Sequence, residues 1–191
     1  MEEFEIKFLE VNVPELEKKL VAIGAEKVGI YDYRRMLLDY PDFRLNKSHS
    51  WIRLRTNGKE TTLAYKESIK NPDDSTGLKD LGMKEIEIIV DDYQKTYELM
   101  KALGFVIKRE EKNKRIRYTK GSAVFDIDFW PFIPPYLEVE STSIQLAKNA
   151  ASELGLDGEV GIISTAGAVY KKYGINKDEY SSITFEGMKK K

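Results

Sequence analysis

The stretch that decides the fold is EFEIKF, residues 3–8, near the start of the chain. Charged and apolar residues alternate in it: Glu3, Glu5 and Lys7 against Phe4, Ile6 and Phe8. Successive side chains of a β-strand point to opposite faces of the sheet, so this pattern predicts a strand with one charged and one apolar face. An antiparallel sheet with one packed side explains the apolar face. The other predicted strands must explain the charged one.

The composition limits the domain count, the compartment and the partners. The 191 residues are 41% hydrophobic and 33% charged, which suits one domain. The 31 basic and 32 acidic side chains nearly cancel, so no overall charge favours nucleic acid or a membrane surface as a partner. The absence of cysteine excludes disulfides, thiolate metal sites and cysteine nucleophiles. The acidic start and the lack of a long apolar run predict a cytoplasmic protein without a signal peptide or membrane span.

Strand and helix patterns alternate along the chain. Strand patterns cover 3–8, 26–39, 49–56, 60–68, 84–90, 106–118, 123–129 and 136–141. Helical spacing covers 13–22, 91–103, 144–154 and 165–173. Hairpin connections predict an antiparallel sheet, and eight strands suffice to close it into a barrel. We expect one domain over 1–175 and a C-terminal tail over 176–191, with a frayed end at its final lysines.

Charges of the same sign recur two residues apart in nearly every predicted strand. The doublets are Glu3 and Glu5, Arg53 and Arg55, Glu85 and Glu87, Arg115 and Arg117, Asp126 and Asp128, and Glu138 and Glu140. Like charges on one face of a sheet repel, so the pattern costs stability unless that face binds something of opposite charge. An ordinary solvated face, where ion pairs are worth only about 0–1 kcal/mol, is the alternative interpretation.

The predicted amphipathic helices can cover the apolar faces from outside. The fold class that follows is α+β: an eight-stranded antiparallel closed β-barrel with a charged lumen and helices packed on the outside. Arginines and lysines in such a lumen suit a polyanion with phosphate oxygens. Carboxylates suit hard divalent cations such as Mg²⁺ or Mn²⁺ that bridge to it. The predicted chemistry is metal-assisted phosphoryl or nucleotidyl transfer.

Several motifs together resemble one family. Glu3 to Lys7 match an ExExK motif, and the similarity continues through WIRLR (51–55), LAYKE (63–67), KEIEI (84–88), KRIRY (114–118) and DFWPFIPPYLEVE (128–140). This order resembles the CYTH family, the triphosphate tunnel metalloenzymes, which includes class IV adenylate cyclases and thiamine triphosphatases. The resemblance covers about residues 1–142. It implies an eight-stranded tunnel that binds a triphosphate or a nucleotide with Mg²⁺ or Mn²⁺.

The resemblance also implies roles for single residues. The phosphate-binding candidates are Lys7, Arg53, Arg55, Lys66 and Arg115, joined by Arg117 on the same predicted face. The metal-binding candidates are Glu3, Glu5, Asp128, Glu138 and Glu140. Lys7, Glu85 and Glu87 are the catalytic candidates, with Glu85 or Glu87 orienting a water molecule. The family often has a lysine where this chain has Asn113, and we expect the adjacent Lys112 or Lys114 to replace it.

These observations lead to three hypotheses. The first is a divalent-metal-dependent triphosphatase acting on inorganic or organic triphosphates. The second is a class IV-type adenylate cyclase that makes cyclic AMP and pyrophosphate from ATP, and the third is a non-catalytic polyphosphate- or nucleotide-binding module. The predicted partner is a small triphosphate or polyphosphate, and family precedent allows a monomer or a homodimer. Arg34 and Arg35 suit either the tunnel rim or an ordinary half-buried strand, and His49 suits the surface better than a general base.

Overall fold

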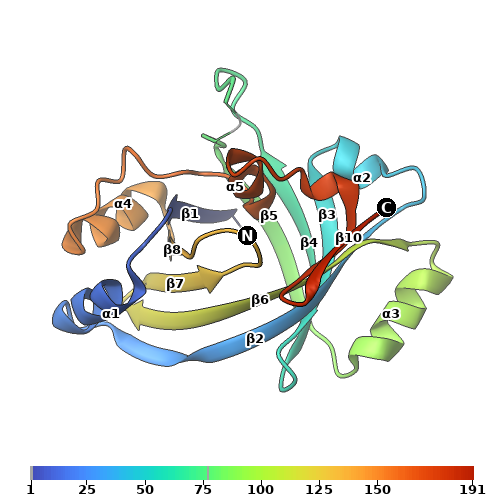
Figure 1. Cartoon of the computed structure of the whole chain (residues 1–191), viewed down its shortest axis with the longest axis horizontal. Helices are drawn as coiled ribbons and strands as arrows, with labels where there is room; N and C mark the ends of the chain where they lie inside the picture. The colour runs from blue at the N-terminus through green and yellow to red at the C-terminus, as the bar shows by residue number, and fades with distance from the viewer. Residues whose placement is uncertain (1, 77) are drawn as a thin grey trace.

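The computed structural model describes residues 2–76 and 78–191, and the side chains of Glu2 and Glu3 lie outside the described residues. The strands are β1 (Glu2–Phe8), β2 (Glu26–Asp39), β3 (Ser50–Thr56), β4 (Thr61–Ile69), β5 (Gly82–Ile89), β6 (Val106–Lys120), β7 (Ala123–Phe129), β8 (Tyr136–Ser141), β9 (Tyr180–Thr184) and β10 (Gly187–Lys190). The helices are α1 (Val13–Ala22), α2 (Arg44–Lys47), α3 (Tyr93–Ala102), α4 (Ile144–Glu153), α5 (Ala166–Lys172) and the 3-10 helix η1 (Lys177–Glu179). Figure 1 shows their arrangement.

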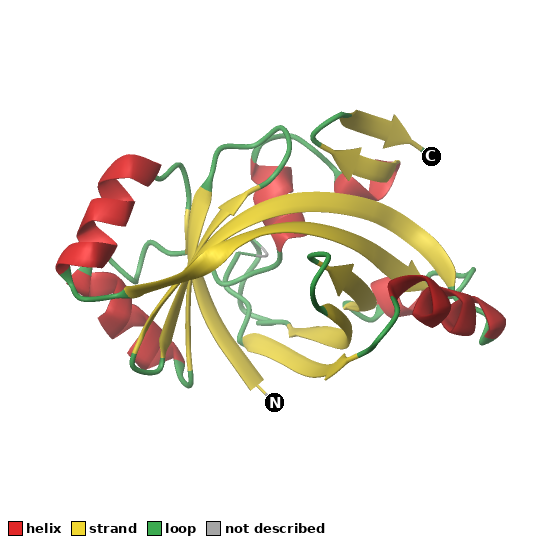
Figure 2. Ribbon diagram, turned by 90° about the horizontal axis from the view of Figure 1, so that it is seen from below, coloured by secondary structure: helices red, strands yellow, loops and turns green. Residues whose placement is uncertain are grey.

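The first eight strands pair as a ring. The order of neighbours is β6, β2, β3, β4, β5, β1, β8 and β7, and a further pairing of β7 with β6 completes it. All of these pairings are antiparallel, as the sequence predicts. The predicted closed barrel is slightly overstated, because within the described residues β1 and β5 pair only through Glu2 with Lys84 and Glu3 with Met83. The sheet is better described as curled into a half-barrel (Figure 2).

Local sequence explains where the main helices begin. The side chains of Asn12, Asp92 and Ser143 each accept a hydrogen bond from a backbone N–H in the first turn of α1, α3 and α4. Such N-caps satisfy donors that the helix itself leaves unpaired. None of the helices within the described residues has the length and hydropathy that a membrane crossing requires.

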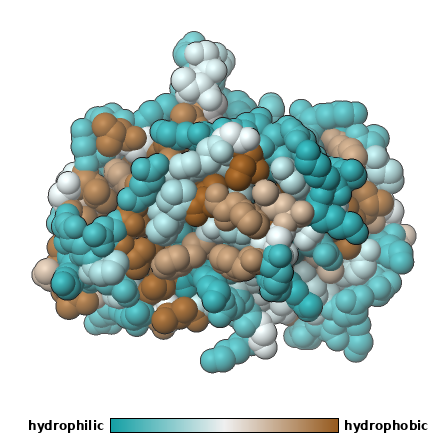
Figure 3. Space-filling model, viewed as in Figure 1, coloured by the Kyte–Doolittle hydropathy of each residue, from teal (hydrophilic) through white to brown (hydrophobic). Residues whose placement is uncertain are grey.

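The apolar strand faces point outward beneath two helices, as predicted. The main core combines Ile6 and Phe8 of β1 with Leu16 and Leu20 of α1 and apolar side chains of β7, β8 and α4. In Figure 1, α1 and α4 lie at the same end of the curled sheet. The surface in the same view is mostly polar, with separate apolar patches (Figure 3). The concave face is therefore left to the charged side chains.

The C-terminal segment differs from the predicted tail. Residues 177–190 form η1 and the hairpin β9–β10 rather than a frayed end. β9 pairs in parallel with β6, joining Ser182 to Glu110 and Ile183 to Glu111. Ile183 is fully buried in a second core with Trp130, Tyr136 and Tyr170. The hairpin ends in lysines, so the hydropathy of this segment does not indicate that it packs against the rest of the protein. Its buried residue, Ile183, contacts side chains that are distant in the sequence.

Gly161→Ala is expected to destabilise the fold. An added Cβ would lie 2.0 Å from Cγ2 of Ile6, which is fully buried. Overpacking of this kind costs about 1–3 kcal/mol. The free energy of unfolding from urea denaturation measures the effect. Gly167→Ala in α5 is the matched control, since its Cβ would meet only the Thr165 hydroxyl at 3.4 Å. Equal stability changes in the two variants would contradict the prediction.

Candidate active site

One cavity of about 980 Å³ lies against the concave face of the sheet, and its walls bring most of the predicted site residues together. Those lining it are Glu5, Lys7, Arg53, Arg55, Lys66, Glu85, Glu87, Arg115, Arg117, Asp128, Glu138 and Glu140. The side chain of Glu3, the remaining metal candidate, lies outside the described residues. Strand alternation explains the convergence, because these residues occupy the inward positions of seven neighbouring strands.

Arg53 is held by the two predicted catalytic glutamates. Its Nη2 donates to Glu85 Oε1 at 2.9 Å and to Glu87 Oε2 at 2.7 Å. Lys66 forms an ion pair with Glu85 at 2.6 Å, and Arg55 forms one with Glu87 at 3.3 Å. Burial and the nearby charge of Arg53 lower the pKa of Arg55 to about 9. Each glutamate thus positions two cations on the wall made by β3, β4 and β5.

Arg115 binds three carboxylates on the neighbouring strands. Its guanidinium donates to Asp126 at 2.5 Å, to both oxygens of Asp128 at 2.7 and 2.6 Å, and to Glu138 at 2.6 Å. Asp126 also accepts from Arg117 at 2.6 Å. Complete burial raises the pKa of Asp128 to about 6, although Arg115 opposes the shift. Burial thus makes the protonated form of Asp128 more accessible than it is for an ordinary aspartate.

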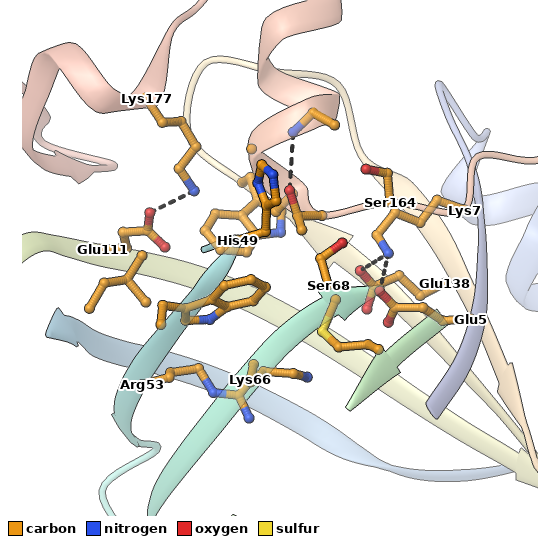
Figure 4. Close-up of a pocket in the computed structure, with 18 of the residues that line it drawn as sticks. Glu5, Lys7, His49, Arg53, Lys66, Ser68, Glu111, Glu138, Ser164 and Lys177 are labelled. Carbon is orange, nitrogen blue, oxygen red and sulfur yellow. Dashed lines mark hydrogen bonds and ion pairs between the residues drawn. The ribbon is translucent and has the colours of Figure 1, made fainter. Parts of the chain in front are cut away.

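Lys7 lies at the other end of the close-up, beside Glu5 and Glu138 (Figure 4). It is 1% exposed, donates to Glu5 and lies 3.4 Å from Glu138. Burial alone would lower the pKa of Lys7, but the two carboxylates outweigh burial and raise it to about 12. Burial alone would raise the pKa of Glu138, but Lys7 and Arg115 lower it to about 2. Lys7 and Glu138 are both charged at neutral pH.

Glu5 and Glu140 face each other across β1 and β8. Burial and the negative charge of Glu5 raise the pKa of Glu140, and the described residues give its carboxylate no hydrogen bond or ion pair. Two like charges opposite each other destabilise a sheet, and a cation between them would relieve this. Carboxylate oxygens are suitable ligands for Mg²⁺ or Mn²⁺.

The other described metal candidates are occupied by protein cations. Asp128 and Glu138 both bind Arg115. Among the described residues, no group of three or more acidic or histidine side chains has an arrangement suited to a metal ion. Glu5 is also bound by Lys7, so Glu140 is the one metal candidate with a described side chain that has no protein cation. Glu140 and the Glu5 opposite it on β1 are the described carboxylates best placed to share a metal ion.

Comparison with known proteins agrees with this geometry. A family model described as the CYTH domain matches residues 1–168. The chain belongs to the CYTH family. No curated protein shows significant sequence similarity to it.

Solved structures share this CYTH fold. The PH1012 protein from Pyrococcus horikoshii OT3 is 24% identical, with a TM-score of 0.67 over 84% of this chain and 94% of the other. A putative adenylate cyclase from Vibrio parahaemolyticus is 12% identical, with a TM-score of 0.74 over 90% and 98%. A putative adenylyl cyclase from Hippeastrum is 17% identical, with a TM-score of 0.63 over 91% and 96%, and is described as having a dominant triphosphatase activity. At these identities the likeness shows the fold alone.

The cavity of this CYTH protein also has lining residues that the sequence pattern did not single out, one of them, Lys177, beyond the residues that the family model matches. Lys177 of η1 forms an ion pair with Glu111 at 2.6 Å, and Glu111 also accepts from Arg109 at 2.6 Å (Figure 4). Burial lowers the pKa of Lys177 to about 8, against the opposing effect of Glu111. Arg109 and Glu111 lie on the same, inward-pointing face of β6 as Arg115. Applying the alternation rule to the first half of β6 would therefore have predicted that they line the cavity. Lys177 has no such local signal.

The lysine expected to replace Asn113 is neither of its neighbours. Lys112 pairs with Glu186 and Lys114 with Asp32, and neither lines the cavity. Instead, Arg35 of β2 donates through Nη2 to Asn113 Oδ1. Arg35 thus supplies the cation nearest this position. His49 and Trp51 also line the cavity; His49 is exposed, as expected.

Proposed function

We propose that this CYTH protein is a divalent-metal-dependent triphosphatase that hydrolyses a triphosphate within its charged cavity. The observation that carries the proposal is the convergence of Lys7, Arg53, Arg55, Lys66, Arg115 and Arg117 on one cavity of about 980 Å³. This volume is within the usual range for small-molecule sites. Guanidinium and ammonium groups in this density suit a chain of phosphates better than a neutral ligand.

The residues of the cavity act chiefly by positioning and by charge neutralisation, the main sources of catalysis in phosphoryl transfer. Arg53 and Arg55 bind phosphate oxygens and are themselves oriented by Glu85 and Glu87. The side chain of Glu85 is 7% exposed and held by Arg53 and Lys66, whereas that of Glu87 is 33% exposed. Glu87 is the better placed of the two to orient the water that attacks the terminal phosphorus. The bridging oxygen then leaves with the remaining diphosphate.

A divalent cation fits the wall opposite these arginines. Glu5 and Glu140, with Glu3 adjacent in the motif, are the residues that would hold Mg²⁺ or Mn²⁺. When bound, the metal supplies positive charge to the phosphate oxygens during transfer. Lys7 donates a hydrogen bond to Glu5 and so orients its carboxylate on this wall.

The adenylate cyclase is the second candidate. Its support is the Vibrio parahaemolyticus structure, described as a putative adenylate cyclase, and Trp51, which lines the cavity and can pack against an organic ring. The hydrolase is preferred because the Hippeastrum relative, also described as a putative cyclase, is said to have a dominant triphosphatase activity. The third candidate, a non-catalytic binding module, predicts metal-dependent binding without turnover.

Product analysis tests the proposal. The purified protein is incubated with ATP or tripolyphosphate, with Mg²⁺, with Mn²⁺ or with EDTA, and orthophosphate, pyrophosphate and cyclic AMP are resolved. We expect metal-dependent release of orthophosphate that EDTA abolishes. Cyclic AMP with equimolar pyrophosphate would establish the cyclase instead. Binding of either compound without any product would establish the binding module.

A further inference from the structure

Arg35 differs from the other buried cations of this protein. Its side chain is 8% exposed and lines the cavity. Within the described residues, the other buried lysines and arginines all form ion pairs with carboxylates: Lys7, Arg53, Lys66, Lys108, Arg109 and Lys177. Arg35 has no such pair there and donates only to the neutral amide of Asn113. A buried charge without a counterion is costly, so a ligand that supplies one would be bound with a large gain.

The carboxylates nearest to Arg35 are engaged elsewhere. Glu111 and Asp128 act on it electrostatically, but Glu111 is bound by Arg109 and Lys177, and Asp128 by Arg115. Burial and the charge of Arg53 outweigh both carboxylates and lower the pKa of Arg35 to about 10. The part of the cavity around Arg35 therefore carries an excess of positive charge.

Three buried donors without a partner belong to side chains that line the same cavity as Arg35. The Nε atoms of Arg35 and Arg53 and the indole Nε1 of Trp130 are buried without a hydrogen-bond partner in the described residues. Arg35 lies 4.7 Å from the Trp130 ring centroid, and Arg53 acts directly on its charge. Buried polar atoms normally have partners, so each orphan requires an explanation. All three are donors, which points to a ligand that offers only acceptors.

The strand register places Arg35 on the wall opposite the proposed metal site. Arg35 of β2 pairs directly with Arg55 of β3, a like-charged pair that mirrors Glu5 and Glu140 on β1 and β8. Around the ring of strands, the β2–β3 join lies four strands from the β1–β8 join, so the two pairs occupy opposite walls. In each pair one member has a protein counterion, Lys7 for Glu5 and Glu87 for Arg55, and the other, Glu140 or Arg35, has none among the described residues. A metal-bound phosphate chain would neutralise both.

We infer that Arg35 is a phosphate-binding residue, oriented by Asn113 and the face of Trp130, that forms an anion site with Arg55. The inference rests on the proposed function, since the ligand is the triphosphate of that same cavity. Asn113 fixes the guanidinium by accepting from Arg35 while its own amide donates to Asp128 at 3.3 Å. The indole face of Trp130 restricts the plane of the group.

Arg35→Met tests the assignment by separating binding from stability. Calorimetric titration of tripolyphosphate in EDTA, where turnover is prevented, measures affinity, and thermal unfolding without ligand measures Tm. We expect binding about ten- to a hundred-fold weaker than in the unmodified protein. We also expect an equal or higher Tm, because the variant removes an unpaired buried charge and its repulsion from Arg55. Arg35→Lys should restore part of the affinity.

Arg34→Met is the matched control, since Arg34 lies on the same strand but outside the cavity, over the Tyr93 ring. Its affinity for tripolyphosphate should be unchanged. Unchanged affinity in Arg35→Met would overturn the inference, as would weaker binding together with a lower Tm that Arg35→Lys does not correct. If the unmodified protein itself fails to bind tripolyphosphate with and without Mg²⁺, the proposed function fails first.

Discussion

Replacing Arg115 by methionine is expected to lower the free energy of unfolding by about 3–5 kcal/mol at neutral pH. Arg115 is the cation bound to Asp126, Asp128 and Glu138. Without it, Asp126 keeps Arg117 and Glu138 keeps Lys7, but Asp128, which is fully buried, has no other ion pair in the described residues. An uncompensated buried carboxylate is the main source of the loss. Urea denaturation monitored by tryptophan fluorescence measures it.

The loss should depend on pH in a defined direction. The pKa of Asp128 is already about 6 in the folded protein against an ordinary value of 3.8, so the folded state binds the proton more tightly than the unfolded state. A raised carboxyl pKa makes stability fall as pH rises through this window. Removal of Arg115 raises that pKa further, so the difference in Tm between Arg115→Met and the unmodified protein should grow from pH 5 to pH 8.

Asp128→Asn supplies the control for this mechanism. The asparagine side chain is neutral, so this substitution removes the buried charge at position 128. The double variant Arg115→Met/Asp128→Asn should therefore be more stable at pH 8 than the single variant Arg115→Met. Contacting residues of this kind commonly couple by about 0.5–3 kcal/mol. A double variant no more stable than the single one, or a Tm difference that does not vary with pH, would contradict the account.

Replacing Arg53 by alanine is expected to lower kcat/KM for the preferred triphosphate by about 10²–10³-fold, with the fold intact. Preorganised donors to a developing negative charge are typically worth this much. The fold should persist because each carboxylate partner of Arg53 retains another cation: Lys66 for Glu85 and Arg55 for Glu87. Steady-state kinetics on tripolyphosphate and ATP, with circular dichroism as the test of folding, measure both parts.

Arg44→Ala is the matched control for Arg53, because Arg44 is an exposed arginine of α2 that does not line the cavity. Its kcat/KM should be unchanged. A folded Arg53→Ala variant with unchanged kinetics would remove Arg53 from the phosphate-binding set and with it the proposed use of this wall. The contrast with Arg115→Met lies in stability. Both arginines belong to the proposed phosphate-binding set, but only the loss of Arg115 leaves a buried carboxylate, Asp128, without an ion pair among the described residues.

The sequence predicted which side chains face the cavity because strand alternation is a local property. Glu5 and Lys7 already show the period of two in the first strand, and the same rule places Arg53, Arg115 and Glu138 inward. Helix positions were also predicted from local spacing: 13–22 matches α1, and 91–103 begins two residues before α3, whose N-cap is Asp92. The CYTH motifs depend on these same local spacings, which is why the family could be identified before the structure.

The tertiary structure decided which charges are paired. Arg35 and Arg53 are both inward-facing arginines on neighbouring strands. Only the tertiary structure shows that Arg53 binds carboxylates whereas Arg35 binds the neutral amide of Asn113. The packing of β9 against β6 and the ion pair of Lys177 with Glu111 join segments far apart in the chain, which no local pattern encodes. The sequence by itself determined the faces of the strands and the kinds of charge upon them. Register and long-range packing determined their partners, because burial and ion pairing depend on distances in space.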